Sequence, residues 1–368
     1  MHTNEYLFPH RQTRRDFLKL TGSATASVAA GFALPGCQSK PPAKPGVRIG
    51  SGYHTYESVE GWGALPEGMS YGFGCGVVVD GRDRVYVTSR SMKPAVAVFD
   101  RHGKLLETWG DEFAVKVGLT PAQVADTAHC LYWSREGSEE FFYWTENVST
   151  NKEGAKVGKR VYKTDLRGRI LYEIGNVAKE GSTAQKFDWT NPTDVAVAPN
   201  GDIYVVDGYG SQRVSRFDRN FKHLKTIGGR GKEHGQFNTC HGVWIKNVKG
   251  REPEVYIADR HNDRLEIFSL ELEYKRTLAG DVRNPCCFYQ HEGHMYIPDL
   301  ASRVTILDVE DKFVAHLGDG KSLADNKTNP ALFAAPHAMC VDSRGDFYVV
   351  EWVDFGRPRK FKHTPQRV

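Results

Sequence analysis

Short apolar segments separated by glycine-containing turns make up most of the chain. The arrangement is clearest over residues 192–217, where an apolar segment, the turn Asn200-Gly201-Asp202 and an aromatic–aliphatic segment ending at Asp207 follow one another. Alternating β-branched and aromatic residues between Gly, Asn and Asp turns are typical of β-strands. Because no helical period is sustained over such lengths, the pattern predicts antiparallel strands joined by short turns.

The same succession of strands occurs six times. Its second strand carries a tyrosine and ends in an acidic or polar residue, and it is found at residues 86–89, 143–146, 203–207, 256–259, 296–299 and 348–351. Four strands repeated at about 45–50 residues are the signature of a β-propeller. We therefore predict one all-β domain over residues 47–363, a six-bladed β-propeller.

The two ends of the domain are expected to complete one blade together. The last repeat has no fourth strand, because the chain ends soon after Phe361, whereas residues 56–63 look like the outer strand at residues 104–110. An N-terminal strand that completes the C-terminal blade would leave no open sheet edge at the join. Across residues 47–363 the repeat resembles the NHL repeat family.

The residue that opens the innermost strand changes in type from repeat to repeat. Aligning the six repeats on this axial position yields Cys75, His129, Thr193, His241, Cys286 and His337. Alternate blades of a six-bladed ring lie about 120° apart, so the three histidines can converge on one point. Three imidazoles and one open position form a catalytic Zn²⁺ site, although Fe²⁺, Mn²⁺ or Co²⁺ also accept such ligands. For each histidine alone, the alternative is a buried residue of the channel wall.

Three residues in the loops that follow second strands are candidates for substrate binding and catalysis. Arg90, Tyr209 and Arg260 are expected at the mouth of the channel. An arginine beside a metal can bind a carboxylate through two hydrogen bonds. A tyrosine whose pKa is lowered by Zn²⁺ and by arginine could act as a general base. The alternative for each arginine is an ordinary solvated loop residue.

Several segments around these positions resemble peptidylglycine α-hydroxyamidating lyases, which cleave a C–N bond in peptide amidation. The segments are 191–197, 206–209, 235–237, 258–260 and 335–337. The resemblance implies a zinc enzyme with a small-molecule or peptide substrate of the α-hydroxyglycine type. It implies zinc ligation by His129, His241 and His337, active-site roles for Arg90 and Arg260, and catalysis by Tyr209.

Two residues depart from the pattern of that family. Ala335 stands where the family has Met two residues before the last histidine. Ala338 stands where the family has an Asp that helps to hold a structural Ca²⁺. The resemblance therefore gives no support for a Ca²⁺ site in this chain, and we expect a substrate pocket of different shape.

The N-terminal residues indicate export. Arg14-Arg15 followed by Phe17-Leu18 is typical of a twin-arginine signal, and residues 34–37 resemble a lipobox that ends at Cys37. We predict a signal peptide over residues 1–37 and a flexible tether over residues 38–46. The twin-arginine translocase would be a partner. The protein would be periplasmic, or anchored through lipid on Cys37 to the outer side of the cytoplasmic membrane or in the outer membrane. The alternative is a soluble secreted protein.

The net charge and the cysteine content bear on the partners and the disulfides that the protein could have. The 368 residues carry a net charge of +4, which gives no electrostatic case for a nucleic-acid partner. Besides Cys37 the chain has Cys75, Cys130, Cys240, Cys286, Cys287 and Cys340. This even number permits disulfides in an oxidising compartment, although small buried channel residues are the alternative. A closed propeller needs no partner for stability, so we expect a monomer.

Three other functions stay open beside a metal-dependent lyase. A non-enzymatic NHL propeller that binds a protein or glycan would not need alternating histidines. A metal-dependent hydrolase like the gluconolactonases would place Glu, Asn and Asp around the channel, and the axial positions have none. An electron-transfer partner with covalent haem would need Cys-x-x-Cys-His, which does not occur. Because propellers host many chemistries, the histidines carry the prediction rather than the fold.

Overall fold

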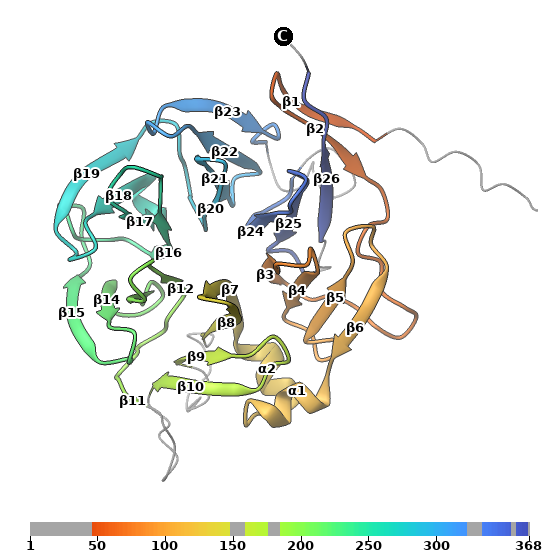
Figure 1. Ribbon diagram of the computed structural model, residues 1–368, viewed down its shortest axis with the longest axis horizontal. Helices are drawn as coiled ribbons and strands as arrows, with labels where there is room; N and C mark the ends of the chain where they lie inside the picture. Colours follow the sequence, from red (N-terminus) through yellow and green to blue (C-terminus); the bar gives the residue numbers. More distant parts are fainter. Residues whose placement is uncertain (1–45, 148–158, 176–184, 322–332, 355–357, 367–368) are drawn as a thin grey trace, which may run out of the picture. The chain divides into compact units, whose positions relative to one another are not determined.

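The chain folds as a six-bladed β-propeller (Figure 1). The computed structural model describes residues 46–147, 159–175, 185–321, 333–354 and 358–366, within the compact unit Gly46–Val368. The predicted signal peptide, the lipobox at Cys37 and the tether up to residue 45 lie outside the described residues, so they stay predictions. The predicted all-β architecture of six repeats is confirmed.

Each blade is a sheet whose innermost strand faces the propeller axis. Blade 1 contains β3 (Gly74–Val79), β4 (Val85–Ser89), β5 (Val96–Phe99) and β6 (Leu105–Trp109). Blade 2 contains β7 (Ala128–Glu136), β8 (Glu139–Glu146), β9 (Arg160–Thr164), β10 (Ile170–Gly175) and β11 (Gln185–Lys186). Blade 3 contains β12 (Asp194–Val197), β13 (Ile203–Val206), β14 (Arg213–Phe217) and β15 (His223–Gly228).

The remaining three blades bring the chain back to its start. Blade 4 contains β16 (Cys240–Lys246), β17 (Glu254–Asp259), β18 (Arg264–Phe268) and β19 (Tyr274–Ala279). Blade 5 contains β20 (Tyr289–His291), β21 (His294–Asp299), β22 (Arg303–Leu307) and β23 (Phe313–Leu317). Blade 6 contains β24 (Pro336–Val341), β25 (Phe347–Glu351), β26 (Arg359–His363), β2 (His54–Val59) and β1 (Arg48–Ser51).

The N-terminal strand closes the ring as predicted. Strand β2 pairs antiparallel with β26, with Tyr56 opposite His363 and Val59 opposite Lys360. The strand begins and ends earlier than the segment 56–63 that the sequence suggested, because residues 60–63 turn inward and bury Trp62 against Phe99 and Tyr348. Strand β1 adds a fifth strand outside β2, which the repeat pattern did not predict.

Two short helices interrupt the otherwise all-β chain between β6 and β7. Helices α1 (Asp111–Lys116) and α2 (Pro121–Thr127) are too short to show a helical period in the sequence. A capping box between Thr120 and Gln123 starts α2, which is the local signal that could have revealed it. Among the described residues, no helix is long and apolar enough to cross a membrane.

One tyrosine per repeat packs between the blades. These six side chains, at the second strand of every blade, are almost completely buried, and they are Tyr86, Tyr143, Tyr204, Tyr256, Tyr296 and Tyr348. Each hydroxyl reaches a hydrogen-bonding group, for example the carboxylate of Asp342 at 2.8 Å from Tyr348. Burial of one such ring stabilises the fold by on the order of 2 kcal/mol. The tyrosine that identified the repeat in the sequence is therefore an inter-blade packing residue.

His54 makes the closed ring sensitive to acid. It lies buried on β2, and its ring centroid is 4.8 Å from that of His294 on blade 5. Burial, together with neighbouring histidines, lowers the pKa of His54 from 6.5 to about 4. Because the unfolded chain binds this proton below pH 6.5 and the folded chain only near pH 4, the neutral ring contributes stability that is lost as the pH falls between these values.

We expect His54→Gln to reduce this acid sensitivity. The free energy of unfolding of the unmodified protein should fall relative to that of the variant as the pH is lowered from 6.5 to 4. Urea denaturation across this range measures the difference, with exposed His102→Gln as control. A difference between the two proteins that is independent of pH would contradict the assignment.

Candidate active site

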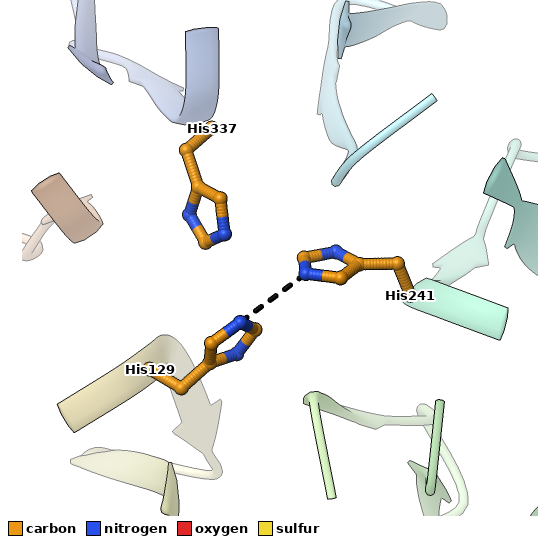
Figure 2. Close-up of side chains that lie close together, drawn as sticks. All are labelled: His129, His241 and His337. Atoms are coloured by element: carbon orange, nitrogen blue, oxygen red, sulfur yellow. Dashed lines mark hydrogen bonds between the residues drawn. The ribbon is translucent and has the colours of Figure 1, made fainter. Parts of the chain in front are cut away.

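Three histidines from alternate blades converge at the axis (Figure 2). His129 lies on β7, His241 on β16 and His337 on β24, and all three are buried. Their ring centroids are 4.9, 5.1 and 5.1 Å apart, and one ring nitrogen of each lies within 4.8 Å of the others. The structure therefore brings together the three side chains that the repeat alignment singled out.

A β-bulge aims each histidine at the axis. The register between the first and second strands shifts across Ala128/Cys130, Cys240/Val243 and Pro336/Ala338, so each histidine lies in the bulged segment. A bulge leaves a residue unpaired and re-aims its side chain. Sequence reasoning missed these bulges, because the residues around them keep their strand-like composition.

A backbone carbonyl of the next blade orients each imidazole. The Nδ1 atoms of His129, His241 and His337 lie 2.6, 2.8 and 2.7 Å from the carbonyl oxygens of Thr193, Cys286 and Cys75. A carbonyl only accepts hydrogen bonds, so each Nδ1 carries a proton and each ring directs its Nε2 atom toward the cluster. The axial residues of the odd blades thus supply the acceptors that fix the tautomers of the even blades.

The Nε2 atoms of His129 and His241 face each other, and neither carries a proton with which to form a hydrogen bond. His129 Nε2 and His241 Nε2 are 3.2 Å apart; a dashed line joins the two rings in Figure 2. His337 Nε2 is buried and has no hydrogen-bond partner among the described residues. Burial lowers the pKa of both His129 and His241 well below 6.5, and nearby positive charge adds to the effect, so protonation does not relieve the repulsion. This donor set fits a divalent transition-metal ion, which accepts several imidazole lone pairs at once.

Tyr209 is held beside the histidines by its loop. The hydroxyl oxygen lies 3.1 Å from His241 Nε2 and accepts a hydrogen bond from Arg260 Nη1 at 3.1 Å. Asp207 anchors the loop, because its carboxylate accepts hydrogen bonds from the Thr190 amide at 3.0 Å and the Ser211 hydroxyl at 2.7 Å.

The protein groups around Tyr209 do not by themselves lower its pKa, and the sequence analysis expected the lowering from Zn²⁺ together with arginine. Removal of the hydroxyl from water raises the pKa above 10, whereas Arg260 and Arg90 act in the opposite direction without cancelling this effect. The reason is that the two guanidinium groups are too few to offset desolvation. A lowered pKa would need the additional charge of a bound cation.

Arg260 and Arg90 both lie near the histidines and Tyr209. Arg260 is buried at the start of the short 3₁₀ turn Arg260–Asn262, and its Nη2 donates to Cys286 Sγ at 3.0 Å. Arg90 donates from Nε to the Ala128 carbonyl at 3.2 Å. Among the described residues, neither guanidinium has a carboxylate within ion-pair distance. Two positive charges therefore face the site without a protein counter-ion.

Sequence reasoning missed Trp352 and Asn147. Trp352 stacks on His337 at 4.9 Å between ring centroids, and the Arg90 guanidinium lies 5.0 Å from the Trp352 ring centroid. Asn147 accepts a hydrogen bond from Arg90 Nη2. Trp352 and Asn147 each come directly after the acidic residue at the end of a second strand. Arg260 has the same position in blade 4, and the sequence analysis selected it for that reason. This shared position is the signal that could have found them.

The six cysteines of the described chain are free and buried. The disulfides that an even cysteine count permits are therefore not formed among the described residues. Cys286 Sγ lies 3.5 Å from His241 Nδ1, on the side of the ring that faces its orienting carbonyl. Ala338 is buried on β24 and has no side-chain oxygen that could bind Ca²⁺.

The NHL repeat family matches residues 190–217 of the chain. Human NHL repeat-containing protein 3 is 27% identical over 211 residues, covering 56% of this chain and 55% of that protein. A probable peptidyl-alpha-hydroxyglycine alpha-amidating lyase of Caenorhabditis elegans is 29% identical over 194 residues, covering 51% of this chain and 47% of that protein. The matched segments thus span about half the length of these curated relatives.

A solved structure supports the fold alone. A protein of unknown function from Bacteroides thetaiotaomicron superposes with a TM-score of 0.53 at 14% identity, covering 86% of this chain and 75% of that chain. The chain is therefore a six-bladed β-propeller in which residues 190–217 match the NHL repeat, and its distant relatives include proteins named as amidating lyases.

We expect Gly208→Ala to displace the loop that carries Tyr209. An added Cβ would lie 2.0 Å from the Cys240 carbonyl oxygen, so the loop must move away from blade 4. The variant should lose about 1–3 kcal/mol of unfolding free energy. Gly110→Ala is the matched control, because the nearest atom outside its chain neighbours, a Glu112 carboxylate oxygen, would be 3.9 Å from the added Cβ, and its φ is −122°. Equal stability of the two variants in urea denaturation would show that Gly208 is not constrained.

Proposed function

We propose that the protein is a metal-dependent lyase that cleaves the C–N bond of an α-hydroxyglycine-type or related substrate. The observation that carries this proposal is the convergence of three unprotonated Nε2 atoms beside a tyrosine hydroxyl and two arginines without carboxylate partners. Relatives named as peptidyl-alpha-hydroxyglycine alpha-amidating lyases support it.

The two arginines would determine the orientation of such a substrate. Arg90 and Arg260 would hold its carboxylate or carbonyl group, since two guanidinium groups can each donate paired hydrogen bonds to oxygen. A divalent ion held by His129, His241 and His337 would supply a Lewis acid that polarises the substrate hydroxyl. Zn²⁺ is the proposed ion, and other divalent transition metals accept the same ligands.

Tyr209 is the proposed general base. Its phenolate would take the proton of the substrate hydroxyl, and the electrons of the O–H bond would form the new C=O bond. The electrons of the C–N bond would leave with the amide nitrogen, which takes up the proton that Tyr209 received, so that the phenolate is restored. The products would be an amide and an aldehyde such as glyoxylate. Arg260, which donates to the Tyr209 oxygen, would stabilise the phenolate.

A binding module is the second candidate function. Human NHL repeat-containing protein 3 also matches the chain, and its name specifies no reaction. A propeller that only binds a protein or glycan would not need three imidazoles oriented toward one point. The two candidates therefore differ in whether the histidine cluster holds a metal. A metal-dependent hydrolase is a third candidate, and hydrolysis of a lactone in place of C–N cleavage would identify it.

Elemental analysis tests the metal. Protein purified after export through its own pathway should contain a transition metal at the histidine cluster, and His241→Ala should lose that ion because only two imidazoles remain. Exposed His102→Ala, as control, should retain it. The same metal content in both variants would show that the histidines do not bind the metal. Absence of any transition metal would favour the binding module.

Tyr209→Phe tests the base. Glyoxylate release from α-hydroxyglycine compounds should fall by at least about 100-fold, since general base catalysis contributes that much or more. Metal content should not change, because all three histidines remain. Tyr274→Phe, at an exposed position on the outermost strand of blade 4, β19, should leave turnover unchanged. Full turnover by Tyr209→Phe would rule out Tyr209 as the essential base.

A further inference from the structure

A second group of potential ligands comes directly after axial residues in the chain. Cys130, Asp194 and Cys287 come one residue after the axial positions of blades 2, 3 and 5. All three are buried, and their sulfur and oxygen atoms lie within 4.8 Å of one another. None of them belongs to the three-histidine cluster.

Asp194 is a buried carboxylate without a cation. Its Oδ1 accepts the Val195 amide at 2.8 Å, and its Oδ2 accepts the Val243 amide at 3.0 Å. Among the described residues, no lysine, arginine or histidine forms an ion pair with it. Burial raises the pKa of this carboxyl to about 6, which reflects the cost of holding the charge away from water. A bound cation would remove this cost.

The surroundings leave room for an ion and its water. A cavity of about 190 Å³ borders the three residues and is otherwise walled by side chains such as Leu131 and Phe288. At the corresponding positions of the other three blades stand Gly76, Gly242 and Ala338, which carry little or no side chain. The cavity can therefore supply a water as a further ligand.

We propose that Cys130, Asp194 and Cys287 bind a thiophilic divalent cation of the Zn²⁺ type. Zn–thiolate bonds are about 2.3 Å long, so one ion can span ligand atoms at these separations. Two thiolates, one carboxylate and a water complete a tetrahedral set, and the two thiol protons leave as the ion binds. Ca²⁺ and Mg²⁺ are excluded as the preferred ions because they take oxygen ligands. The ion would join blades 2, 3 and 5 across the channel.

Cobalt substitution tests this site on the unmodified protein. Protein purified with its thiols reduced, stripped of metal and titrated with Co²⁺ should develop a thiolate-to-cobalt charge-transfer band in the near ultraviolet. The three histidines have no sulfur, so a cobalt ion bound only by them would not produce this band. Binding of Co²⁺ with no charge-transfer band would overturn the proposal without recourse to any variant.

Substitutions of single residues show which side chains bind the cobalt ion that produces the charge-transfer band. Cys130→Ser and Asp194→Asn should each weaken binding of the ion that produces the band by about 10-fold or more, since even the loss of a group that hydrogen-bonds to a metal ligand costs about that much. Cys340→Ser removes another buried thiol on β24 and should leave the band unchanged. An undiminished band in Cys130→Ser would contradict the proposed ligand set.

The same titration separates this site from the proposed lyase centre. His337→Ala should retain the charge-transfer band and lose one bound ion, because His337 shares no cluster with the cysteines. Cys130→Ser should weaken binding of the ion that produces the band and retain the ion at the histidines. Failure of one site with survival of the other therefore identifies which of the two proposals is wrong.

Discussion

The hydrogen bonds from three backbone carbonyls to three imidazoles determine what the channel can do. Thr193, Cys286 and Cys75 each accept from the Nδ1 of a histidine in the preceding blade, which directs every Nε2 toward the cluster. Each of these bonds crosses a boundary between blades, and the bond from His337 to Cys75 crosses the boundary between the last blade and the first. The orientation of the cluster therefore depends on closure of the ring by β2 and β26.

The acidic residue at the end of the second strand links the fold to the site. Asp207 accepts the Thr190 amide at 3.0 Å, and Asp259 accepts the Asn238 amide at 2.7 Å. In blades 3 and 4 this carboxylate holds the segment that enters the inner strand, while the residues directly after it form a loop beside the channel. One structural motif thus places an axial residue and a loop residue at the same end of the blade. Variation of the loop residue changes the chemistry at little cost to the fold.

The proposed metal sites use the same channel in two different ways. The imidazoles converge beside a tyrosine hydroxyl and two arginines, an arrangement suited to binding a substrate. Cys130, Asp194 and Cys287 lie against a cavity with largely apolar walls, and no arginine or tyrosine hydroxyl bonds to them among the described residues. Such a setting is suited to an ion that joins blades rather than one that acts on a substrate.

The sequence by itself determined the number of blades, the closure by an N-terminal strand and the set of axial residues. These features repeat at a regular spacing or depend on strand patterns that are local in the chain. The tertiary structure alone decided the bulges that aim the histidines, the carbonyls that set their tautomers and the raised pKa of Tyr209. It also brought Trp352 against His337 and Cys130 beside Cys287. These features arise from contacts between blades, whose residues are far apart in sequence, and no repeat pattern encodes such distances.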